Sequence, residues 1–582
     1  MKDTRYKGRG RDWGFEPHAA SPLSGIGLRA DARTAGEGRT ASMSHGVNDK
    51  VSLALTYGVL YSPTMRPASE SQLSLWADAP SAAPVGYPTE SAYWRGSLAS
   101  RARSRDEQKR LGQFMTPAPI ARFIAARMVA DRDWRGRSVR LLDPAAGSGV
   151  LASALVEAAV SSAARPARIQ LLMCELDPAM LPLLETCTSE LESLCAIHGV
   201  EFEGRIQGGD FLQSAFARSG QPHIDAVIAN PPYFKLAGDD ERARAFAHAV
   251  HGQPNIYALF MASCASLLRE GGAFGFITPR SWTNGAYFRA LRRCLFARMA
   301  LDGLHLFDSR EAHFQADAVL QEALITWATA GAPQQAVAVS CSQGAADLAA
   351  VKTPLWPASQ VIDAAPEYNV SIPDARMQYG LSHLPLRLHD IGLKVSTGAV
   401  VGFRAAAHLR SQPAPSTVPM LWMPHVRPMR VEWPRQHRAE HIARSDASAW
   451  MLLPNQPMVL MRRFSPKEDT RRITAAPYLG DLPGSRIGLE NHLNVIHPIA
   501  GPLSVDAARG LAAYLNSKPV DDHMRSVLGS TQVNAIELRN LPLPDLATLE
   551  AIGRAVVTGG SLEDAVVGAC RPTGAARPAR HA

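Results

Sequence analysis

The stretch VRLLDPAAGSG, residues 139–149, passes from a short apolar run into an acid, a proline and a turn of small residues. The apolar run predicts a buried β-strand, and the glycines let the backbone turn sharply and come close to a ligand. The turn has neither the GxGxxG spacing of a dinucleotide site nor the Lys-Ser/Thr that completes a P-loop. Asp143, at the end of the strand, instead suits a ligand that carries positive charge.

The alternation of strand and helix continues on both sides of this turn. Predicted strands cover 139–143, 168–175, 202–210, 224–229 and 272–278, and predicted helices cover 119–129, 150–159, 178–197 and 256–269. Strands that alternate with helices at this spacing indicate an α/β fold with a parallel, doubly wound, Rossmann-like sheet. Ligands of such sheets bind at the carboxyl ends of the strands.

Two further acids stand at predicted strand ends. Glu175 could accept hydrogen bonds from two ribose hydroxyls, and Asp210 could accept one from an adenine amine while Phe211 lies against the adenine ring. Each acid alone could equally be a helix cap or a surface charge. Together with the turn they match S-adenosylmethionine, which carries an ammonium and a sulfonium group. The predicted cofactor contacts of this edge are Asp143, Ala145, Gly147, Glu175, Asp210 and Phe211.

The motif Asn230-Pro231-Pro232-Tyr233 directly follows the fourth predicted strand. The Asn230 side-chain oxygen and the Pro231 carbonyl could accept the two N–H groups of an aromatic amine, which would free its lone pair for methylation. The prolines stiffen the loop, and Tyr233 offers a face on which a base can stack. A base inside a duplex must flip out to reach such a pocket. Taken alone, the motif could also be a rigid turn.

The cysteines bear on the type of chemistry. None of the seven follows a proline, whereas cytosine-C5 methylation needs a nucleophilic cysteine that usually follows one. None forms a CxxC pair with zinc-site spacing, so no metal is expected. Methylation of an amino group therefore fits the sequence better than covalent catalysis.

The order of these motifs resembles that of amino-group DNA methyltransferases of the gamma arrangement, which occur in restriction–modification systems. The stretch GQFMTP, residues 112–117, comes first, then the turn at Asp143, then the motif at Asn230. The resemblance implies site-specific methylation of adenine in double-stranded DNA, with a separate cognate restriction endonuclease as a possible partner. It also implies that Thr116 contacts the methionine part of the cofactor and that Phe314 packs on the flipped base.

The resemblance extends into the C-terminal part of the chain. Four stretches are similar to blocks of adenine enzymes: STGAVVGFR (396–404), RRFS (462–465), ENHLN (490–494) and TQVN (531–534). The family usually has Asp where Gly402 stands, which leaves the local contact there in question. The DNA contacts that the resemblance implies are Arg404, Arg462, Arg463 and Asn534.

Positive charge gathers in the same part of the chain. Residues 391–480 hold 13 Lys and Arg but five Asp and Glu, an excess that equals the net charge of +8 for the whole chain. A basic region of this kind suits nucleic acid, although a solvated basic surface would look the same.

The expected organisation has five segments. They are a mostly disordered extension (1–100), a catalytic and cofactor-binding domain (101–335), a connecting segment (336–384), a mixed α/β target-recognition domain (385–545) and a C-terminal helix with a flexible tail (546–582). No uncharged apolar run is long enough to span a membrane, and the N-terminal stretch has no apolar core typical of a secretion signal. We therefore expect a cytoplasmic, DNA-associated protein.

Two classes of alternative stay open. The same motif could methylate another amine, such as cytosine N4 in DNA, an amine of RNA or a glutamine side chain. The chain could also be a DNA-binding module with a relic methyltransferase fold. Replacing Asn230 would separate the second class from an enzyme, because methyl transfer would vanish while binding persists.

Overall fold

The computed structural model describes residues 87–103, 115–250, 254–307, 323–363, 367–373, 381, 383–435, 439–465, 469–528 and 532–570. Phe314 and residues 1–86 lie outside these ranges, so the expectations that concern them are not addressed by the structure.

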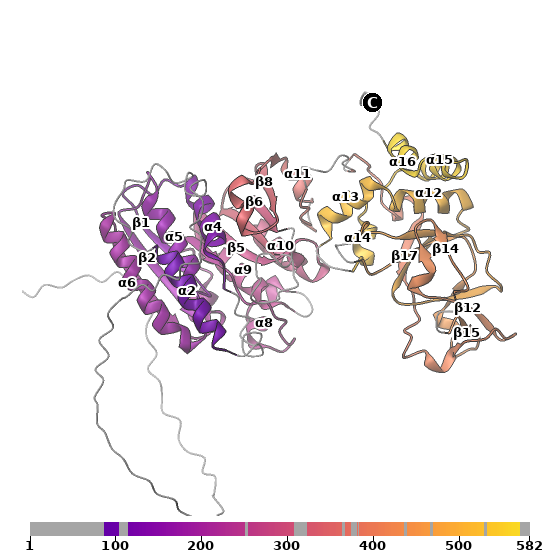
Figure 1. Cartoon of the computed structure of the whole chain (residues 1–582), viewed down its shortest axis with the longest axis horizontal. Coiled ribbons are helices and arrows are strands. Elements are labelled where there is room, and N and C mark those ends of the chain that lie inside the picture. The colour runs from indigo at the N-terminus through magenta and orange to yellow at the C-terminus, as the bar shows by residue number, and fades with distance from the viewer. Residues whose placement is uncertain are drawn as a thin grey trace, which may run out of the picture. The chain divides into compact units, whose positions relative to one another are not determined.

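A large sheet forms the centre of the N-terminal domain (Figure 1). In the described residues it has nine strands in the order β3-β2-β1-β4-β5-β7-β6-β8-β9. Their bounds are β1 Ser138–Asp143, β2 Arg168–Glu175, β3 Glu201–Gly208, β4 Ile224–Ala229, β5 Leu268–Pro279, β6 Met299–Phe307, β7 Ala323–Ala330, β8 Val337–Ser342 and β9 Leu355–Trp356. Strands β1 to β5 are parallel, and β7 runs antiparallel between β5 and β6.

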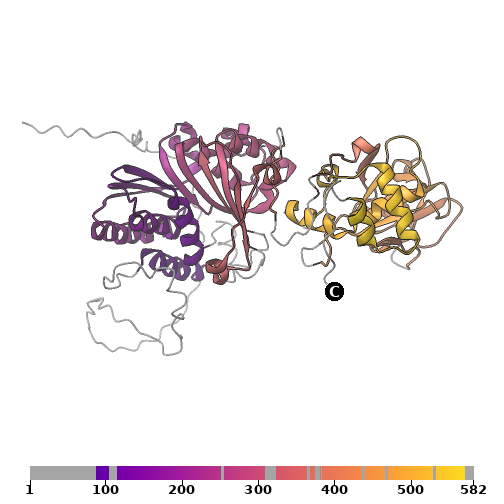
Figure 2. The same ribbon diagram turned by 90° about the horizontal axis from the view of Figure 1, so that it is seen from above.

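Helices cover both faces of this sheet, as Figure 2 shows. One face carries α2 (Pro88–Arg101), α4 (Ala118–Ala130), α5 (Val150–Ser161) and α6 (Leu181–Ile197), and the other carries α7 (Ala215–Ser219), α9 (Ile256–Leu267) and α10 (Arg289–Phe296). Two short helices, α8 (Glu241–Ala245) and α11 (Ala358–Val361), lie in connecting loops. Successive residues of β1 point to opposite faces, so Leu141 joins one apolar core and Leu142 the other. The predicted Rossmann-like α/β fold class is confirmed.

Two parts of the N-terminal domain lie in segments that were expected to be separate from it. Helix α2 lies inside the segment 1–100 that was expected to be mostly disordered. It has no apolar stripe that would reveal it, because Thr89, Ala92 and Gly96 are among its buried residues. A Cβ at Gly96 would lie 2.3 Å from Ser148 Oγ, so only glycine lets this helix pack so closely on the turn after β1. Strands β8 and β9 likewise extend the large sheet into the segment 336–384 that was expected to be a connection.

The C-terminal domain is a mixed α/β unit, as predicted. Its sheets have the orders β10-β20-β17-β18, β11-β15-β12-β19-β16 and β13-β14. The strands are β10 Leu393–Thr397, β11 Leu409–Arg410, β12 Thr417–Leu421, β13 Val426–Arg427, β14 Arg430–Val431, β15 His441–Ala443, β16 Leu452–Pro454, β17 Met458–Arg462, β18 Ala475–Tyr478, β19 Arg486–Leu489 and β20 Leu493–Pro498. The helices are α12 Val505–Leu515, α13 Lys518–Val527, α14 Ala535–Arg539, α15 Leu546–Val557 and α16 Leu562–Ala569.

The boundary expected at residue 545 does not divide the apolar core. Leu549 and Ile552 of α15 and Val566 of α16 are buried in the same cluster as α12. Helices α12 and α15 cross at Gly510, where a Cβ would lie 1.7 Å from the carbonyl oxygen of Leu549. Residues 546–570 therefore complete this domain. Among the described helices, none is long and apolar enough to span a bilayer.

Candidate active site

The carboxyl ends of the parallel strands bring the predicted site residues to one edge of the sheet. In sheet order, the residues just at or after these ends are Asp210 (β3), Glu175 (β2), Asp143 (β1), Asn230 (β4) and Arg280 (β5). This is the edge at which such sheets bind their ligands. Arg280 is the member of the row that the sequence analysis did not single out. It directly follows its strand as Asn230 does, so a search for polar residues at the carboxyl ends of predicted strands could have found it.

The turn after β1 depends on two glycines. Gly147 and Gly149 have φ values of +56° and +89°, which residues with a Cβ rarely adopt. A Cβ at Gly149 would also lie 2.6 Å from Cys187 Sγ. The amide of Ala146 donates to the carbonyl of Cys174 at 2.9 Å and so anchors the turn to β2. These constraints leave the backbone of residues 145–149 close to the strand ends.

Asp143 is fully buried beneath this turn. Its Oδ1 accepts from the Ala145 amide at 3.2 Å, whereas its buried Oδ2 has no hydrogen-bond partner. The pKa of the Asp143 carboxyl is raised to about 7, chiefly by burial and also by the nearby Glu175 carboxylate. A buried carboxylate with an unpaired oxygen is energetically costly, and a cationic ligand bound beside it would reduce that cost.

Glu175 supports the turn directly. Its Oε2 accepts from the Gly147 amide at 2.7 Å, and its Oε1 accepts from the Asp177 amide at 2.8 Å. Burial raises the pKa of Glu175 in spite of these bonds. Each carboxylate oxygen has a second lone pair, so contacts with ribose hydroxyls remain a prediction.

Asp210 and Phe211 lie at the start of the 3₁₀ helix 211–213. Asp210 accepts from the Leu212 amide at 2.9 Å and forms an ion pair with Arg242 at 3.2 Å. Phe211 is buried and stacks on Phe260, with ring centroids 5.5 Å apart. The structure therefore gives Phe211 a packing partner in the core, and its contact with an adenine ring remains a prediction.

The motif after β4 is held by side-chain hydrogen bonds. Asn230 Nδ2 donates to Thr116 Oγ1 at 3.0 Å, so the residue expected near the methionine part of the cofactor lies beside the motif. The Tyr233 hydroxyl hydrogen-bonds to Asn230 Oδ1 and to the carbonyl of Ile277, the latter at 3.0 Å. The Tyr233 ring meets Tyr257 edge to face at 6.2 Å. Burial raises the pKa of Tyr233, which keeps its hydroxyl protonated.

The four C-terminal stretches that carry the resemblance meet at one place. Thr397 pairs with Asn494 across β10 and β20, and Val400 forms a bridge with Glu490. The Arg463 amide donates to the carbonyl of His492 at 2.9 Å. The Arg463 carbonyl in turn accepts from the amide of Val533 at 2.8 Å. These contacts join all four stretches, from 396–404 to 531–534.

The predicted DNA-contact residues differ in their exposure to solvent and in their hydrogen bonds within the protein. Arg404 is exposed, and its guanidinium lies over the ring of Phe403, which is 80% exposed. Arg462 donates to the carbonyl of Val426 at 2.8 Å and is partly buried. Asn534 is also partly buried and donates to Glu537 at 3.3 Å.

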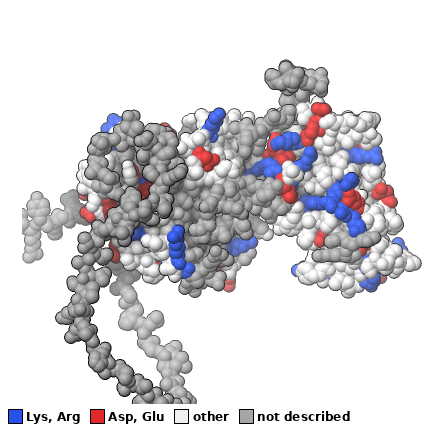
Figure 3. Space-filling view, viewed as in Figure 1, with Lys and Arg blue, Asp and Glu red and all other residues white. Residues whose placement is uncertain are grey.

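Arg463 is partly buried as well. It donates to the carbonyl of Asn491 at 3.4 Å and to Gln532 Oε1 at 3.5 Å. Figure 3 shows that blue and red side chains alternate on the visible face of the C-terminal domain, so its positive charge is interspersed with acids.

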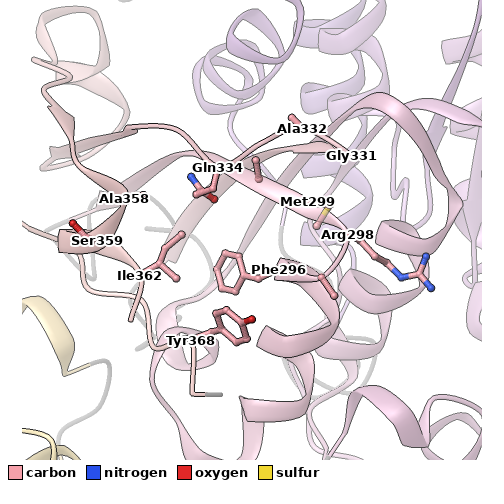
Figure 4. A pocket seen from close by; sticks show the side chains of 12 residues that line it. Phe296, Arg298, Met299, Gly331, Ala332, Gln334, Ala358, Ser359, Ile362 and Tyr368 are labelled. Carbon is pink, nitrogen blue, oxygen red and sulfur yellow. The ribbon is translucent and has the colours of Figure 1, made fainter. Parts of the chain in front are cut away.

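A pocket of about 380 Å³ lies elsewhere in the N-terminal domain (Figure 4). It is lined by the turn before β6, the turn after β7 and the region of α11, with the rings of Phe296 and Tyr368 5.7 Å apart. Strand β6 runs parallel to β5 because both are antiparallel to β7, so Met299 marks the amino end of the sheet. The pocket is thus at the edge opposite Asp143, and none of its lining residues is acidic.

The sheet order and the row of strand-end residues define a methyltransferase of the Rossmann-like class. Residues 198–314 match the family described as Eco57I restriction-modification methylase. The type II methyltransferase M.BsuBI of Bacillus subtilis is 32% identical over 463 residues, which cover 77% of this chain and 90% of that protein. M.PstI of Providencia stuartii, also a type II methyltransferase, is 31% identical over 469 residues, or 78% and 90% of the two chains. The chain therefore belongs to the type II restriction–modification methyltransferases.

A more distant likeness covers most of the chain. The structure of the type IIL restriction-modification enzyme MmeI in complex with DNA aligns with 80% of this chain and 69% of that one. The sequence identity is 12% and the TM-score is 0.46, so the assignment rests on the two relatives above.

Proposed function

We propose that this methyltransferase transfers a methyl group from S-adenosylmethionine to the exocyclic amine of an adenine flipped out of double-stranded DNA. It would thereby protect DNA from a separate restriction endonuclease of the same specificity, in the compartment that holds the DNA. The observation that carries the proposal is the position of Asn230. It lies at the end of β4, hydrogen-bonded to Thr116, one strand away from the buried carboxylate of Asp143.

The residues around Asp143 fit the cofactor. The unused Oδ2 of Asp143 offers an acceptor to a cationic group, and the backbone of Gly147 leaves room where a side chain would stand. Glu175 and Asp210 would accept from the ribose and the adenine amine, and Thr116 would contact the methionine part. Bound S-adenosylmethionine supplies a methyl group on positively charged sulfur, so an amine with a free lone pair can take the methyl while the sulfur keeps the bonding electrons.

Asn230 and Pro231 would prepare the amine. The lone pair of an adenine amine is delocalised into the ring, which makes the nitrogen a poor nucleophile. If Asn230 Oδ1 and the Pro231 carbonyl each accept one N–H, the nitrogen becomes pyramidal and its lone pair is released. Two adjacent prolines hold these acceptors in place, so little reorganisation is needed when the base arrives. The nitrogen loses its extra proton to water after transfer.

Tyr233 would leave its present hydrogen bond when a base enters. Its hydroxyl now bonds to Asn230 Oδ1, the oxygen that we assign to the adenine amine. An incoming base must therefore displace this hydroxyl, and the Tyr233 ring would then stack on the base. The Phe314 contact expected from the resemblance would add a second aromatic surface.

The C-terminal domain would bind the DNA. The convergence of the four resembling stretches supports this role, because it places Arg463, Gln532 and Asn534 in one cluster. The exposed Arg404, with Phe403 beneath it, would contact the phosphate backbone from the first of these stretches.

Transfer of labelled methyl groups tests the proposal. Purified wild-type protein with methyl-labelled S-adenosylmethionine should label double-stranded DNA on adenine. Asn230→Ala should abolish labelling while it still binds both cofactor and DNA, since Asn230 acts on the amine only. Label on cytosine would replace the substrate assignment with the N4 alternative, and an active Asn230→Ala variant would contradict the role of Asn230.

A further inference from the structure

Helix α13 of the C-terminal domain ends against the active-site edge of the large sheet. The last carbonyls of any α-helix have no partner within the helix, so they need donors from elsewhere. Here Arg280 donates to the carbonyls of Arg525 and Ser526, at 2.8 and 2.6 Å. Asn284 donates to the carbonyl of Val527 at 2.8 Å. A guanidinium at a helix C-terminus also opposes the negative end of the helix dipole.

Arg280 belongs to the catalytic edge itself. It is 3% exposed and begins the 3₁₀ helix Arg280–Thr283 directly after β5, the strand next to the one that ends at Asn230. The neighbouring Ser281 Oγ is 2.8 Å from the hydroxyl of Tyr257, and Tyr257 packs edge to face on Tyr233. Arg280 is thus linked to the catalytic motif through its chain neighbour Ser281 and two successive side-chain contacts.

The other side of α13 is tied to the stretch that follows Arg463. Asp521 accepts from the Arg472 amide at 2.6 Å and pairs with Arg525 Nε at 2.8 Å. The Arg525 guanidinium donates to the carbonyl of Asp469 at 2.9 Å. The helix that Arg280 holds is therefore the same helix that braces residues 469–472, next to a predicted DNA-contact stretch.

We propose that Arg280 is a positioning residue that sets the register between the target-recognition domain and Asn230. This proposal rests on the proposed function, because it presumes that bound DNA must deliver one base to Asn230. The role that we assign to Arg280 needs no contact with base or cofactor, because Arg280 holds the helix between the DNA-contact stretches and the catalytic edge. Losing it would let the bound DNA shift relative to Asn230, and a misplacement of about 1 Å can cost on the order of 100-fold in rate.

The test compares Arg280→Met and Arg280→Lys with wild type on the recognised DNA site and on sites with one mismatched base pair. Arg280→Met should lower kcat on the recognised site at least tenfold and lower the preference over mismatched sites at least fivefold. Cofactor affinity should stay within twofold, because Asp143 and its turn are unchanged. Arg280→Lys should recover part of kcat, since an ammonium can still donate to the helix carbonyls.

Arg132→Met is the matched control. Arg132 also donates to a backbone carbonyl, that of Gly271 at 2.6 Å, but within the N-terminal domain and away from α13. It should leave site preference unchanged. The proposal is overturned if Arg280→Met keeps kcat and site preference within twofold of wild type. It is also overturned if cofactor affinity falls in parallel with activity, which would show that Arg280 only supports the fold.

Binding without catalysis separates this inference from the proposed function. Fluorescence anisotropy gives the affinity ratio between recognised and mismatched DNA with no methyl transfer. If wild type transfers nothing, the proposed function fails, and the ratio still decides on Arg280. A lower ratio in Arg280→Met supports its role in setting the register, and an unchanged ratio contradicts it.

Discussion

At the scale of single residues, Asp143 links the fold to ligand binding. Its carboxyl is buried with one unused oxygen, and burial raises its pKa to about 7 from an ordinary value of 3.8. A raised carboxyl pKa means that the folded protein favours the protonated form. This contribution to stability is complete below the ordinary pKa and is lost as the pH rises through 7. The protein without ligand therefore bears the cost of a buried charge above pH 7, which a bound cation would offset.

Cofactor affinity should consequently depend on pH. Between pH 7 and 5.5 the affinity for S-adenosylmethionine should fall by up to roughly tenfold per pH unit as Asp143 becomes protonated. Glu175, whose pKa burial also raises, acts in the same direction. Calorimetric titration across this range measures the slope. Asp143→Asn should bind weakly and with a flatter profile; an unchanged slope in this variant would assign the titration to another group.

Tyr233 allows the ring and the hydroxyl to be tested separately. Tyr233→Phe removes the hydrogen bond to Asn230 Oδ1 but keeps the stacking surface, so kcat/KM on DNA should stay within about tenfold of wild type, the effect of one hydrogen bond. Tyr233→Ala also removes the ring, and loss of about 1–3 kcal/mol of base stacking should lower kcat/KM by roughly 5- to 150-fold. Single-turnover methylation measures both. Equal losses in the two variants would show that the hydroxyl carries the effect.

At the scale of elements, the sequence predicts the strands that end at the site better than the helix and strands that pack around them. The strands ending at Asp143, Glu175 and Asn230 are apolar runs closed by polar residues, and they were located to within a residue or two. Helix α2 was not predicted because its packing face consists largely of small and polar residues. Strands β8 and β9 were not predicted. Strand β8 pairs with the more distant β6, and this pairing leaves no local pattern, while β9 has only 2 residues, too few to show one.

Helix α2 offers a test of this packing. Gly96→Ala would place a methyl group against Ser148 Oγ, so we expect a loss of about 1–3 kcal/mol in the free energy of unfolding through overpacking, together with weaker cofactor binding. Gly568→Ala in α16 is the matched control, because no atom lies within 4 Å of its Cβ position. It should stabilise the protein by up to about 1 kcal/mol. Chemical denaturation compares them, and a neutral Gly96→Ala would contradict the close packing.

At the scale of the whole molecule, part of the positive charge counted in the C-terminal domain is paired or buried within that domain. Arg427, Arg430 and Arg435 all pair with Glu432. Arg472 is 3% exposed and donates to the carbonyl of Ser465. Counting charges along the chain could not separate such side chains from free ones, because burial and pairing depend on tertiary contacts.

An exposed arginine in a predicted DNA-contact stretch and an exposed arginine elsewhere should affect DNA binding differently. Arg404→Gln should weaken binding about equally for all DNA sequences and reduce the slope of log affinity against log salt by about one, as expected for a lost phosphate contact. Arg298→Gln, an exposed arginine at the pocket on the opposite edge of the sheet, should leave the slope unchanged. Salt titrations of DNA binding measure both. A change for Arg298→Gln as large as that for Arg404→Gln would argue for general electrostatics alone.

The identity of the methylated base tests the whole account most directly. Modification-sensitive sequencing of DNA from cells that express the wild-type protein, set beside cells that express Asn230→Ala, reads the base and its sequence context together. We predict N6-methyladenine within one recurring sequence in the first culture and none there in the second. Methylcytosine alone, or no modified base at all, would contradict it.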